Sequence, residues 1–161
     1  MNIFFLDKTP EQSAHYLCDK HVVKMALETA QMLCTAYQQK YGIKEDLYKP
    51  AYSNHPMTKW VGNTGGNFFF TMRLFDCITD EYATRYLKWH KSRKTILLLH
   101  RKYKEWRDWK TPFTTPPQCM PDKYKLRSDL YVEAYRRYYR GEKNYFAKWD
   151  KVRNTPDWWI K

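Results

Sequence analysis

A stripe of polar residues with reactive side chains runs along one predicted helix near the start of the chain. It consists of Lys20, His21, Lys24, Glu28 and Gln31. Because positions three, four and seven apart fall on the same side of an α-helix, these side chains share one narrow sector. A carboxylate can exchange protons with a substrate, and an amine can attack an electrophilic carbon. The stripe therefore predicts a site for acid–base or nucleophilic catalysis.

The same stripe also has a purely structural interpretation, as the solvated face of an amphipathic helix with a Lys24–Glu28 ion pair. Lys before Glu is the weaker orientation of an i,i+4 pair, which makes this a modest stabilising device. The rest of the helix surface is apolar and marks the helix as central and largely buried. Its apolar residues are Val22, Val23, Ala26, Leu27, Ala30, Leu33 and Cys34. Polar side chains on a central helix favour the functional interpretation.

The charge of the chain indicates a polyanionic partner. Lys and Arg number 29 against 17 acidic residues, which gives a net charge of +12. Aromatic residues make up 18% of the sequence and are interleaved with the cations, an arrangement that stacks bases and holds phosphates. This favours nucleic acid, and DNA in particular, over anionic lipid. The alternative is a Tyr-rich core under a solvated basic surface.

Several classes of protein are excluded by missing motifs. The sequence has no phosphate-binding Gly-rich loop, no dinucleotide fingerprint, no serine nucleophile elbow and no H-E-x-x-H. The four cysteines show no C-x2-4-C spacing, so we expect neither a metal nor another cofactor, and Cys18 near His21 is interpreted as a core thiol. Neither a secretory signal nor a long apolar run is present. We therefore expect a cytoplasmic protein with reduced thiols and no membrane partner.

The elements that must position the stripe are mainly helical. Asn2 to Leu6 is short and rich in strand formers, so it predicts an extended segment. Thr9-Pro10 with Gln12 predicts a helix start, and Gly42 predicts its end after Tyr41. A helix of about thirty residues exceeds the usual length in globular proteins, which allows for a kink or a break inside it.

Later elements are predicted from turn residues and helical periodicity. In order, they are a connector from Lys44 to Asn54, a short helix through Trp60, a turn from Gly62 to Gly66, helices from Asn67 to His90 and from Ser92 to Trp106, a proline-rich loop from Thr111 to Pro121, and a last helix capped by Ser128. A chain of 161 residues can bury one core but is too short for two ordinary domains. We predict a mainly α, compact helical bundle forming one domain over residues 1–161, with its oligomeric state left open.

Three further groups of residues are candidates for nucleic-acid contact. They are the basic and aromatic cluster Arg85, Lys88, Trp89 and His90, which could stack an extruded base, the last-helix arginines Arg136, Arg137 and Arg140, and the helix start Gly65, Gly66 and Asn67, whose N–H groups could approach an anion. Each group also has an ordinary structural interpretation. The arginines fit a solvated helix face, and the glycines fit a tight turn.

One spacing resembles a known family. Asp19-Lys20-His21, followed by Glu28 seven positions after His21, resembles the small phage pyrimidine-dimer DNA glycosylases of the endonuclease V type. Looser similarities lie at His55 and in the segment Tyr135 to Tyr139. The resemblance implies an all-helical domain that acts on damaged DNA, releases a base and then cuts the strand through a Schiff base. The chain also looks like small uncharacterised phage proteins, in which case the host cytoplasm is its expected location.

The resemblance implies roles for particular residues. Glu28 would take the role of the family's glutamate, which assists an α-amine that attacks the sugar C1′. This sequence has Leu27 where the family has an arginine, and Asn2 where the family exposes a small residue after Met removal. The amine is therefore that of Met1, or of Lys20 or Lys24 in its place.

The function predicted from the sequence is a DNA glycosylase and abasic-site lyase that acts on damaged or modified bases in duplex DNA. Glu28 supplies the carboxylate in this prediction, and Lys24 or Met1 supplies the amine. Two other functions remain open, namely a non-catalytic basic phage protein that binds DNA or RNA, and a small inhibitor of host proteins. Cleavage of DNA containing abasic sites or dimers separates the first function from the other two.

Overall fold

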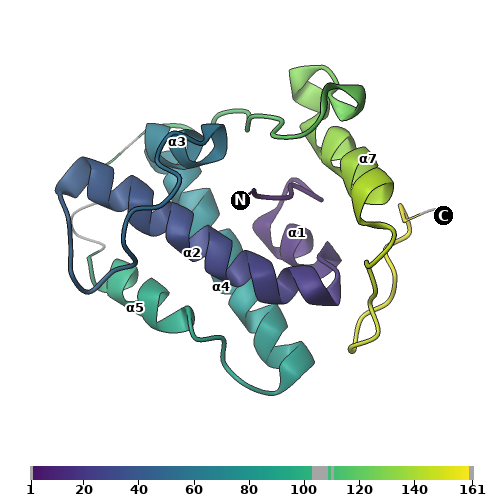
Figure 1. Cartoon of the computed structure of the whole chain (residues 1–161), viewed down its shortest axis with the longest axis horizontal. Coiled ribbons are helices and arrows are strands. Elements are labelled where there is room, and N and C mark those ends of the chain that lie inside the picture. Colours follow the sequence, from purple (N-terminus) through teal and green to yellow (C-terminus); the bar gives the residue numbers. More distant parts are fainter. Residues whose placement is uncertain (1, 103–108, 110, 160–161) are drawn as a thin grey trace.

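The N-terminal segment is extended, as predicted, and it lies inside the molecule. The structure is a computed structural model that describes residues 2–102, 109 and 111–159. Asn2 to Leu6 has no regular secondary structure, and the side chains of Ile3, Phe5 and Leu6 are buried. Figure 1 shows this segment in the middle of the view, between the helices α1 to α5 and the helix α7.

The first predicted helix is divided in two. Helix α1 spans Pro10–Tyr16 and α2 spans Asp19–Tyr41, with Leu17 and Cys18 in extended conformations between them. Thr9 caps α1 by accepting a hydrogen bond from the Gln12 N–H, and Gly42 ends α2 with a φ of 81°. The start, the end and the predicted break are all confirmed.

The segment from Pro56 forms two helices separated by one residue. Helix α3 spans Pro56–Asn63 and α4 spans Gly65–Tyr86. Only Thr64 lies between them, and its side chain accepts from the Asn67 N–H and caps α4. The predicted turn from Gly62 to Gly66 is therefore too long, because Thr64 supplies the cap and Gly65 and Gly66 already belong to the first turn of α4.

The next two helices also differ at their ends from the prediction. Helix α4 stops at Tyr86, because Leu87 adopts the left-handed conformation with a φ of 53° and cannot continue the helix to His90. Helix α5 spans Arg93–Arg101. The predicted end of this helix at Trp106 lies outside the described residues.

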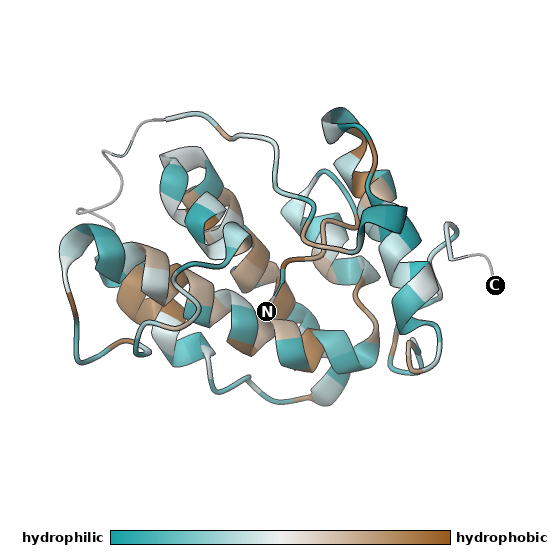
Figure 2. Cartoon of the chain, turned by 45° about the horizontal axis from the view of Figure 1, so that its top comes forward, coloured by the Kyte–Doolittle hydropathy of each residue, from teal (hydrophilic) through white to brown (hydrophobic). Residues whose placement is uncertain are grey.

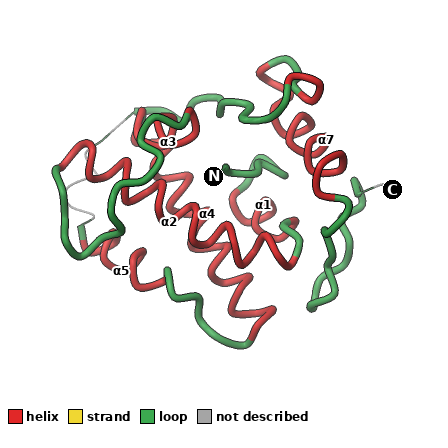
Figure 3. Tube along the Cα trace, in the orientation of Figure 1, coloured by secondary structure: helices red, strands yellow, loops and turns green. Residues whose placement is uncertain are grey.

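The proline-rich segment is a loop, as predicted, and leads to the last helix. Thr111 to Pro121 has no helix, and short 3-10 turns follow at Asp122–Tyr124 (η1) and Ser128–Leu130 (η2). Helix α7 spans Tyr131–Lys143. Ser128 begins the turn η2 and does not cap α7, whose first residue follows Leu130 with no side-chain cap. Figure 3 shows helices and loops, and no strand, in the described part of the chain.

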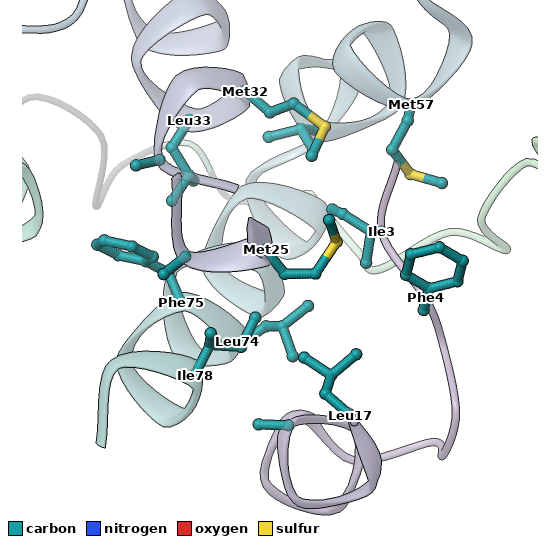
Figure 4. Close-up of a cluster of buried hydrophobic side chains, with 14 of the residues drawn as sticks. Ile3, Phe4, Leu17, Met25, Met32, Leu33, Met57, Leu74, Phe75 and Ile78 are labelled. Carbon is teal, nitrogen blue, oxygen red and sulfur yellow. The ribbon is translucent and has the colours of Figure 1, made fainter. Parts of the chain in front are cut away.

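A mixed aliphatic and aromatic core holds the N-terminal segment in place. Helices α2 and α4 pack against each other, and α1 and α3 pack against α4. Figure 4 shows Ile3 and Phe4 in the same cluster as Met25 of α2 and Met57 of α3. Figure 2 shows hydrophobic (brown) and hydrophilic (teal) residues alternating along the helices, as expected for amphipathic helices around a core. Burying the first residues among helices from the whole chain fixes the position of its N-terminal end.

The helix α2 is central, but its apolar surface is not entirely buried. Val22, Ala26, Ala30, Leu33 and Cys34 are in the core, as predicted. Val23 and Leu27, in contrast, are 39% and 40% exposed. The prediction was wrong for these two residues, because no helix packs over the strip of α2 that contains them within the described structure. None of the described helices is both long and apolar enough to cross a membrane.

Candidate active site

The N-terminal segment meets the carboxylate of α2. The backbone N–H of Asn2 donates a hydrogen bond of 3.0 Å to Glu28 Oε2. On the other side of the carboxylate, Lys24 Nζ lies 3.4 Å from Glu28 Oε1. The Glu28 side chain is 14% exposed, so it is accessible but well enclosed. Hydrogen bonds to an ionised carboxylate are stronger than neutral ones, and this contact joins the start of the chain firmly to α2.

Asn2 is held by residues from the C-terminal half of the chain. Its side-chain Nδ2 donates to the Cys119 carbonyl at 2.8 Å, and the Tyr135 hydroxyl donates to its Oδ1 at 3.4 Å. The neighbouring Ile3 and Phe4 are buried in the core. The position of Asn2 at Glu28 therefore depends on the proline-rich loop and on α7 together.

A hollow of about 340 Å³ opens beside Glu28. This volume lies within the usual range for small-ligand sites. Its lining consists of Val23, Lys24, Leu27, Glu28, Gln31, Tyr52 and His90. The exposed apolar strip of α2 thus forms part of its wall, and the polar half of the predicted stripe faces the same space.

The other two lining residues come from the connectors on either side. The Ala51 N–H donates a hydrogen bond of 3.0 Å to Thr35 Oγ1 of α2. This bond places the neighbouring Tyr52 at the end of the hollow that lies towards the C-terminus of α2. His90 lines the hollow as well, together with Val23 from the N-terminal half of α2. The loop after α4 and the connector before α3 therefore close the two ends of a space along α2.

The basic and aromatic cluster predicted around Trp89 is split by the structure. His90 packs edge-on against Tyr82 at 4.8 Å, and burial lowers its pKa, an effect that the bond to Val23 partly offsets. Trp89 is exposed and carries the Arg93 guanidinium 3.8 Å from its ring centre. Lys88 is exposed as well. His90 is thus the member of this cluster that lines the hollow.

Arg85 does not face solvent, which corrects its prediction as a DNA contact. Its side chain is 0% exposed and makes ion pairs with Glu81 at 2.9 Å and Asp19 at 3.1 Å. It also donates to the carbonyls of Leu17 at 2.7 Å and His15 at 2.9 Å. The guanidinium fastens the break between α1 and α2 to α4, and it cannot reach a phosphate in this structure.

His21 and Lys20 point away from the hollow. The His21 ring stacks on Phe4 at 4.8 Å, and its Nδ1 shares a 2.7 Å hydrogen bond with the Tyr139 hydroxyl. Burial, helped by the charges of Lys143 and Lys24, lowers the pKa of His21 to about 3. Lys20 lies over the Phe146 ring at 5.5 Å. The N-terminal segment and the C-terminal part of the chain bury His21, whereas Lys20 is exposed but does not line the hollow. The structure therefore does not bring either residue to the hollow beside Glu28.

The buried neutral His21 predicts a loss of stability in mild acid. The pKa of His21 is about 3 in the folded chain, below the ordinary value of 6.5. Between these two pH values, His21 is therefore protonated in the unfolded chain and neutral in the folded chain. This difference does not affect stability above pH 6.5, and it lowers the free energy of unfolding increasingly as the pH falls from 6.5 towards 3. Between pH 7 and pH 5 it amounts to about 2 kcal/mol. Urea unfolding at the two pH values should show that His21→Gln loses about this much less stability than the wild type, and equal losses would contradict the prediction.

Two of the three arginines predicted on α7 bind other parts of the protein. Arg136 donates to the Leu6 carbonyl at 2.8 Å and pairs with Asp7 at 3.3 Å. Arg140 donates to the Trp158 carbonyl at 2.9 Å. Arg137 is exposed and pairs with Glu133. Arg136 and Arg140 are therefore partly exposed and already bonded within the protein, whereas Arg137 is exposed, and phosphate binding by these three residues stays a prediction.

The backbone N–H groups at the start of α4 are also bonded to other residues of the protein. The Gly65 N–H donates to Thr111 Oγ1 at 2.7 Å, the Gly66 N–H donates to the Thr111 carbonyl at 2.8 Å, and the Asn67 N–H is bonded to Thr64. A Cβ on Gly65 would overlap the Trp109 carbonyl oxygen. This corrects the prediction of an anion contact here, since the glycines allow the loop to approach and the N–H groups are satisfied by it.

Two nearby residues were not among the predicted site residues. Tyr52 lines the hollow, and His55 caps α3, with its Nδ1 accepting from the Met57 N–H at 3.1 Å. Burial and the positive charge of the chain's N-terminus lower the pKa of His55, and Glu28 opposes them. The sequence indicates His55 only through a loose similarity to the family, and the His55-Pro56 pair is in addition a helix-start signal. Tyr52 has no such signal in the sequence.

The comparisons with known proteins decide the family. A model of the pyrimidine dimer DNA glycosylase family matches residues 1–95, which include Asn2, Glu28 and every described residue that lines the hollow. The chain belongs to this family. No curated protein and no solved structure matches it. Membership confirms the resemblance found in the sequence and identifies the chain as a DNA glycosylase.

The family assignment agrees with the composition of the site. Within the described residues, no three His, Cys, Asp or Glu side chains are grouped so as to hold a metal ion. The polar side chains that line the hollow are one carboxylate, one ammonium group, one amide, one imidazole and one tyrosine, and the backbone N–H of Asn2 is bonded to the carboxylate. Pyrimidine dimer DNA glycosylases act on DNA, and the net charge of +12 suits that substrate.

Proposed function

We propose that this glycosylase removes damaged pyrimidine bases from duplex DNA by amine chemistry at Glu28 and then cuts the strand as a lyase. The observation that carries the proposal is the 3.0 Å hydrogen bond from the Asn2 N–H to Glu28 Oε2. An amine at the start of the chain is covalently tied to this position. The proposed nucleophile is therefore the α-amine of Met1, or that of Asn2 if Met1 is removed.

The proposed reaction begins with the neutral amine attacking the sugar C1′. A bond forms from nitrogen to C1′, the bond from C1′ to the base nitrogen breaks, and the base leaves with that electron pair and takes up a proton. Opening of the sugar ring then gives an imine, with a proton delivered to the ring oxygen. Glu28 can take the proton that the amine loses and return it to the ring oxygen, because a carboxylate beside the amine serves as base and then as acid.

The imine provides the proposed lyase step. Loss of a proton from C2′ drives elimination of the 3′ phosphate, which leaves with the electrons of the C3′–O bond. Water then hydrolyses the imine and regenerates the amine. Lys24 is the competing nucleophile, since its Nζ lies 3.4 Å from Glu28 and lines the same hollow. Lys20 is not retained in the proposal because its amine lies over Phe146.

Borohydride trapping tests the proposal directly. Duplex DNA carrying one cyclobutane pyrimidine dimer, and a matched duplex carrying one abasic site, would each be incubated with the protein and sodium borohydride. We expect a covalent adduct with both substrates, because borohydride reduces an imine to a stable amine. Peptide mass spectrometry should place the adduct on the N-terminal peptide, and the intact mass identifies Met1 or Asn2 as its first residue.

The control for this experiment is Lys24→Met, which should still be trapped through the α-amine. An adduct on the peptide that contains Lys24, lost in this variant, would reassign the nucleophile to Lys24. If neither duplex gives an adduct or a nick, the amine mechanism fails, and a binding protein without catalysis becomes the better account.

A further inference from the structure

The chain after α7 packs across the start of α2. The Asp19 N–H donates to the Lys148 carbonyl at 2.9 Å, and the Asp150 N–H donates to Asp19 Oδ2 at 2.8 Å. Between these two bonds, the Trp149 side chain is buried, and its Nε1 donates to the Tyr16 carbonyl at 3.1 Å. Figure 1 shows the chain after α7, in yellow-green, beside this end of α2. The segment is therefore bonded to both α1 and α2.

Lys151 follows in the same segment, between two residues that bind the body of the protein. On one side of it lies the buried Trp149. On the other side, Arg153 donates to the two carboxylate oxygens of Glu81 at 3.1 Å and 2.8 Å. Lys151 itself is exposed, and its Nζ lies 5.2 Å from the ring centre of Tyr86. The backbone of the segment is thus held on both sides of Lys151, while its ammonium group stays at the surface.

The same surface continues along α2 to the hollow beside Glu28. Lys20 is exposed, and its Nζ lies 5.5 Å from the ring centre of Phe146 in the segment after α7. Lys24, four residues later, lines the hollow, and its side chain is 64% exposed. Four residues of α-helix advance about 6 Å, which is close to two nucleotide steps of about 3.4 Å along a duplex. The lysines therefore form a path from the hollow to the segment after α7.

The lysines outside the hollow on this path have no acidic partner. Among the described residues, Lys20, Lys148 and Lys151 form no ion pair, whereas Lys123 and Lys125 each pair with a carboxylate. A lysine that already pairs with a carboxylate must give up that contact to bind another anion. An unpaired ammonium group in solvent has no such contact to lose, so it is the better phosphate ligand.

We propose that Lys20, Lys148 and Lys151 bind backbone phosphates of the duplex, so that the DNA extends from the hollow across the segment after α7. The inference rests on the proposed function for the position of the reacting nucleotide at Glu28. The segment from residue 146 to 151 contains one acidic residue, Asp150, against two lysines, and it lies outside the matched residues 1–95. Phosphate contacts of this kind position a protein on DNA without reading its sequence.

A pair of double substitutions tests this surface in the full-length protein. Lys148→Gln with Lys151→Gln removes two unpaired charges. Lys123→Gln with Lys125→Gln is the matched control, because it removes the same charge from exposed lysines that have acidic partners. Lys148→Arg with Lys151→Arg keeps the charge. Thermal unfolding should show that all three variants remain folded, because the substituted side chains lie at the surface.

The measurement is the affinity for a duplex that carries one reduced abasic site, which cannot form an imine, at salt concentrations from about 50 to 200 mM. Each phosphate contact contributes about 0.9 to the slope of log Kd against log salt. We expect Lys148→Gln with Lys151→Gln to lower this slope by about 2, so that the affinity lost over this range is about 10-fold smaller than in the wild type. Adding Lys20→Gln should lower the slope by about 1 more. The arginine variant and the control should keep the wild-type slope.

The inference is overturned if the slope of the Lys148→Gln and Lys151→Gln variant falls no further than that of the control, or if the arginine variant loses as much. A wild type whose affinity does not change with salt also overturns it. If the slopes are as expected but the wild type gives neither adduct nor nick, the phosphate contacts are supported and the proposed amine mechanism is contradicted.

Discussion

Glu28→Gln is expected to slow base excision by about 10²- to 10⁴-fold while leaving the fold nearly intact. Gln has the same shape and can still accept the hydrogen bond from the Asn2 N–H, which is 3.0 Å long in the wild type. It cannot accept a proton at the pH of the reaction. The loss should therefore fall on the reaction rate, because the carboxylate acts on the transition state rather than on the bound DNA.

The measurement is single-turnover excision from a dimer-containing duplex, accompanied by DNA affinity and circular dichroism. Glu133→Gln is a suitable control, because Glu133 lies on α7, pairs with Arg137 and Arg140 and is not part of the hollow. Its excision rate should equal that of the wild type. If Glu28→Gln loses helicity, or retains full activity, the carboxylate has the structural role of an ion-pair partner for Lys24.

The second large effect concerns stability, and Arg85→Met is expected to lower the free energy of unfolding by about 3–5 kcal/mol. The Arg85 side chain is 0% exposed, and it pairs with both Asp19 and Glu81. Met fills similar space but leaves the Asp19 carboxylate and the carbonyls of Leu17 and His15 without this donor. A buried charge without a partner is costly, so the effect exceeds that of an ordinary surface substitution.

Urea unfolding followed by circular dichroism measures this difference. Arg137→Met is the matched control, because Arg137 is exposed and its pair with Glu133 is solvated. We expect it to change stability by less than about 0.5 kcal/mol. Near-equal unfolding free energies for the two variants would show that the Arg85 network contributes little.

The helices could be predicted from the sequence because their signals are local. Thr9 and Pro10 specify the start of α1, and Gly42 specifies the end of α2, within a few residues of the position that they determine. The errors arose where the backbone departs from local preference. Leu87 takes a left-handed conformation that its residue type disfavours, so no rule based on sequence would end α4 there.

The candidate site was predictable only in part. A helical wheel shows which side of a helix a side chain is on, but not which other parts of the chain pack over that side. His21 and Glu28 lie on the same side of α2, about 10 Å apart along its axis. The residues that cover His21, among them Phe4 and Tyr139, come from distant parts of the chain. Glu28 meets Asn2 and an open hollow instead. Spacing within one helix cannot distinguish these two surroundings.

The same limit explains the misassigned arginines. Arg85 and Arg136 resemble phosphate contacts in the sequence because Asp19 and Asp7, with which they pair, are far away along the chain. Arg85 also pairs with Glu81 one helical turn earlier, but that spacing does not show that the pair is buried. Long-range ion pairs leave no pattern in a single sequence. Arg137 differs because its partner Glu133 lies one helical turn away and both remain on the surface.

The hydrogen bonds that hold Asn2 have a consequence for the order of protein synthesis. The first residues leave the ribosome early, but the Cys119 carbonyl and the Tyr135 hydroxyl that fix Asn2 are made more than a hundred residues later. Until then the N-terminal segment has no complete binding place beside Glu28. A nascent chain that contains only residues 1–95 therefore carries the family's matched region without the residues that hold Asn2 at the candidate site. The candidate site can therefore assemble only after residues 119 to 135 have been made and their bonds to Asn2 can form.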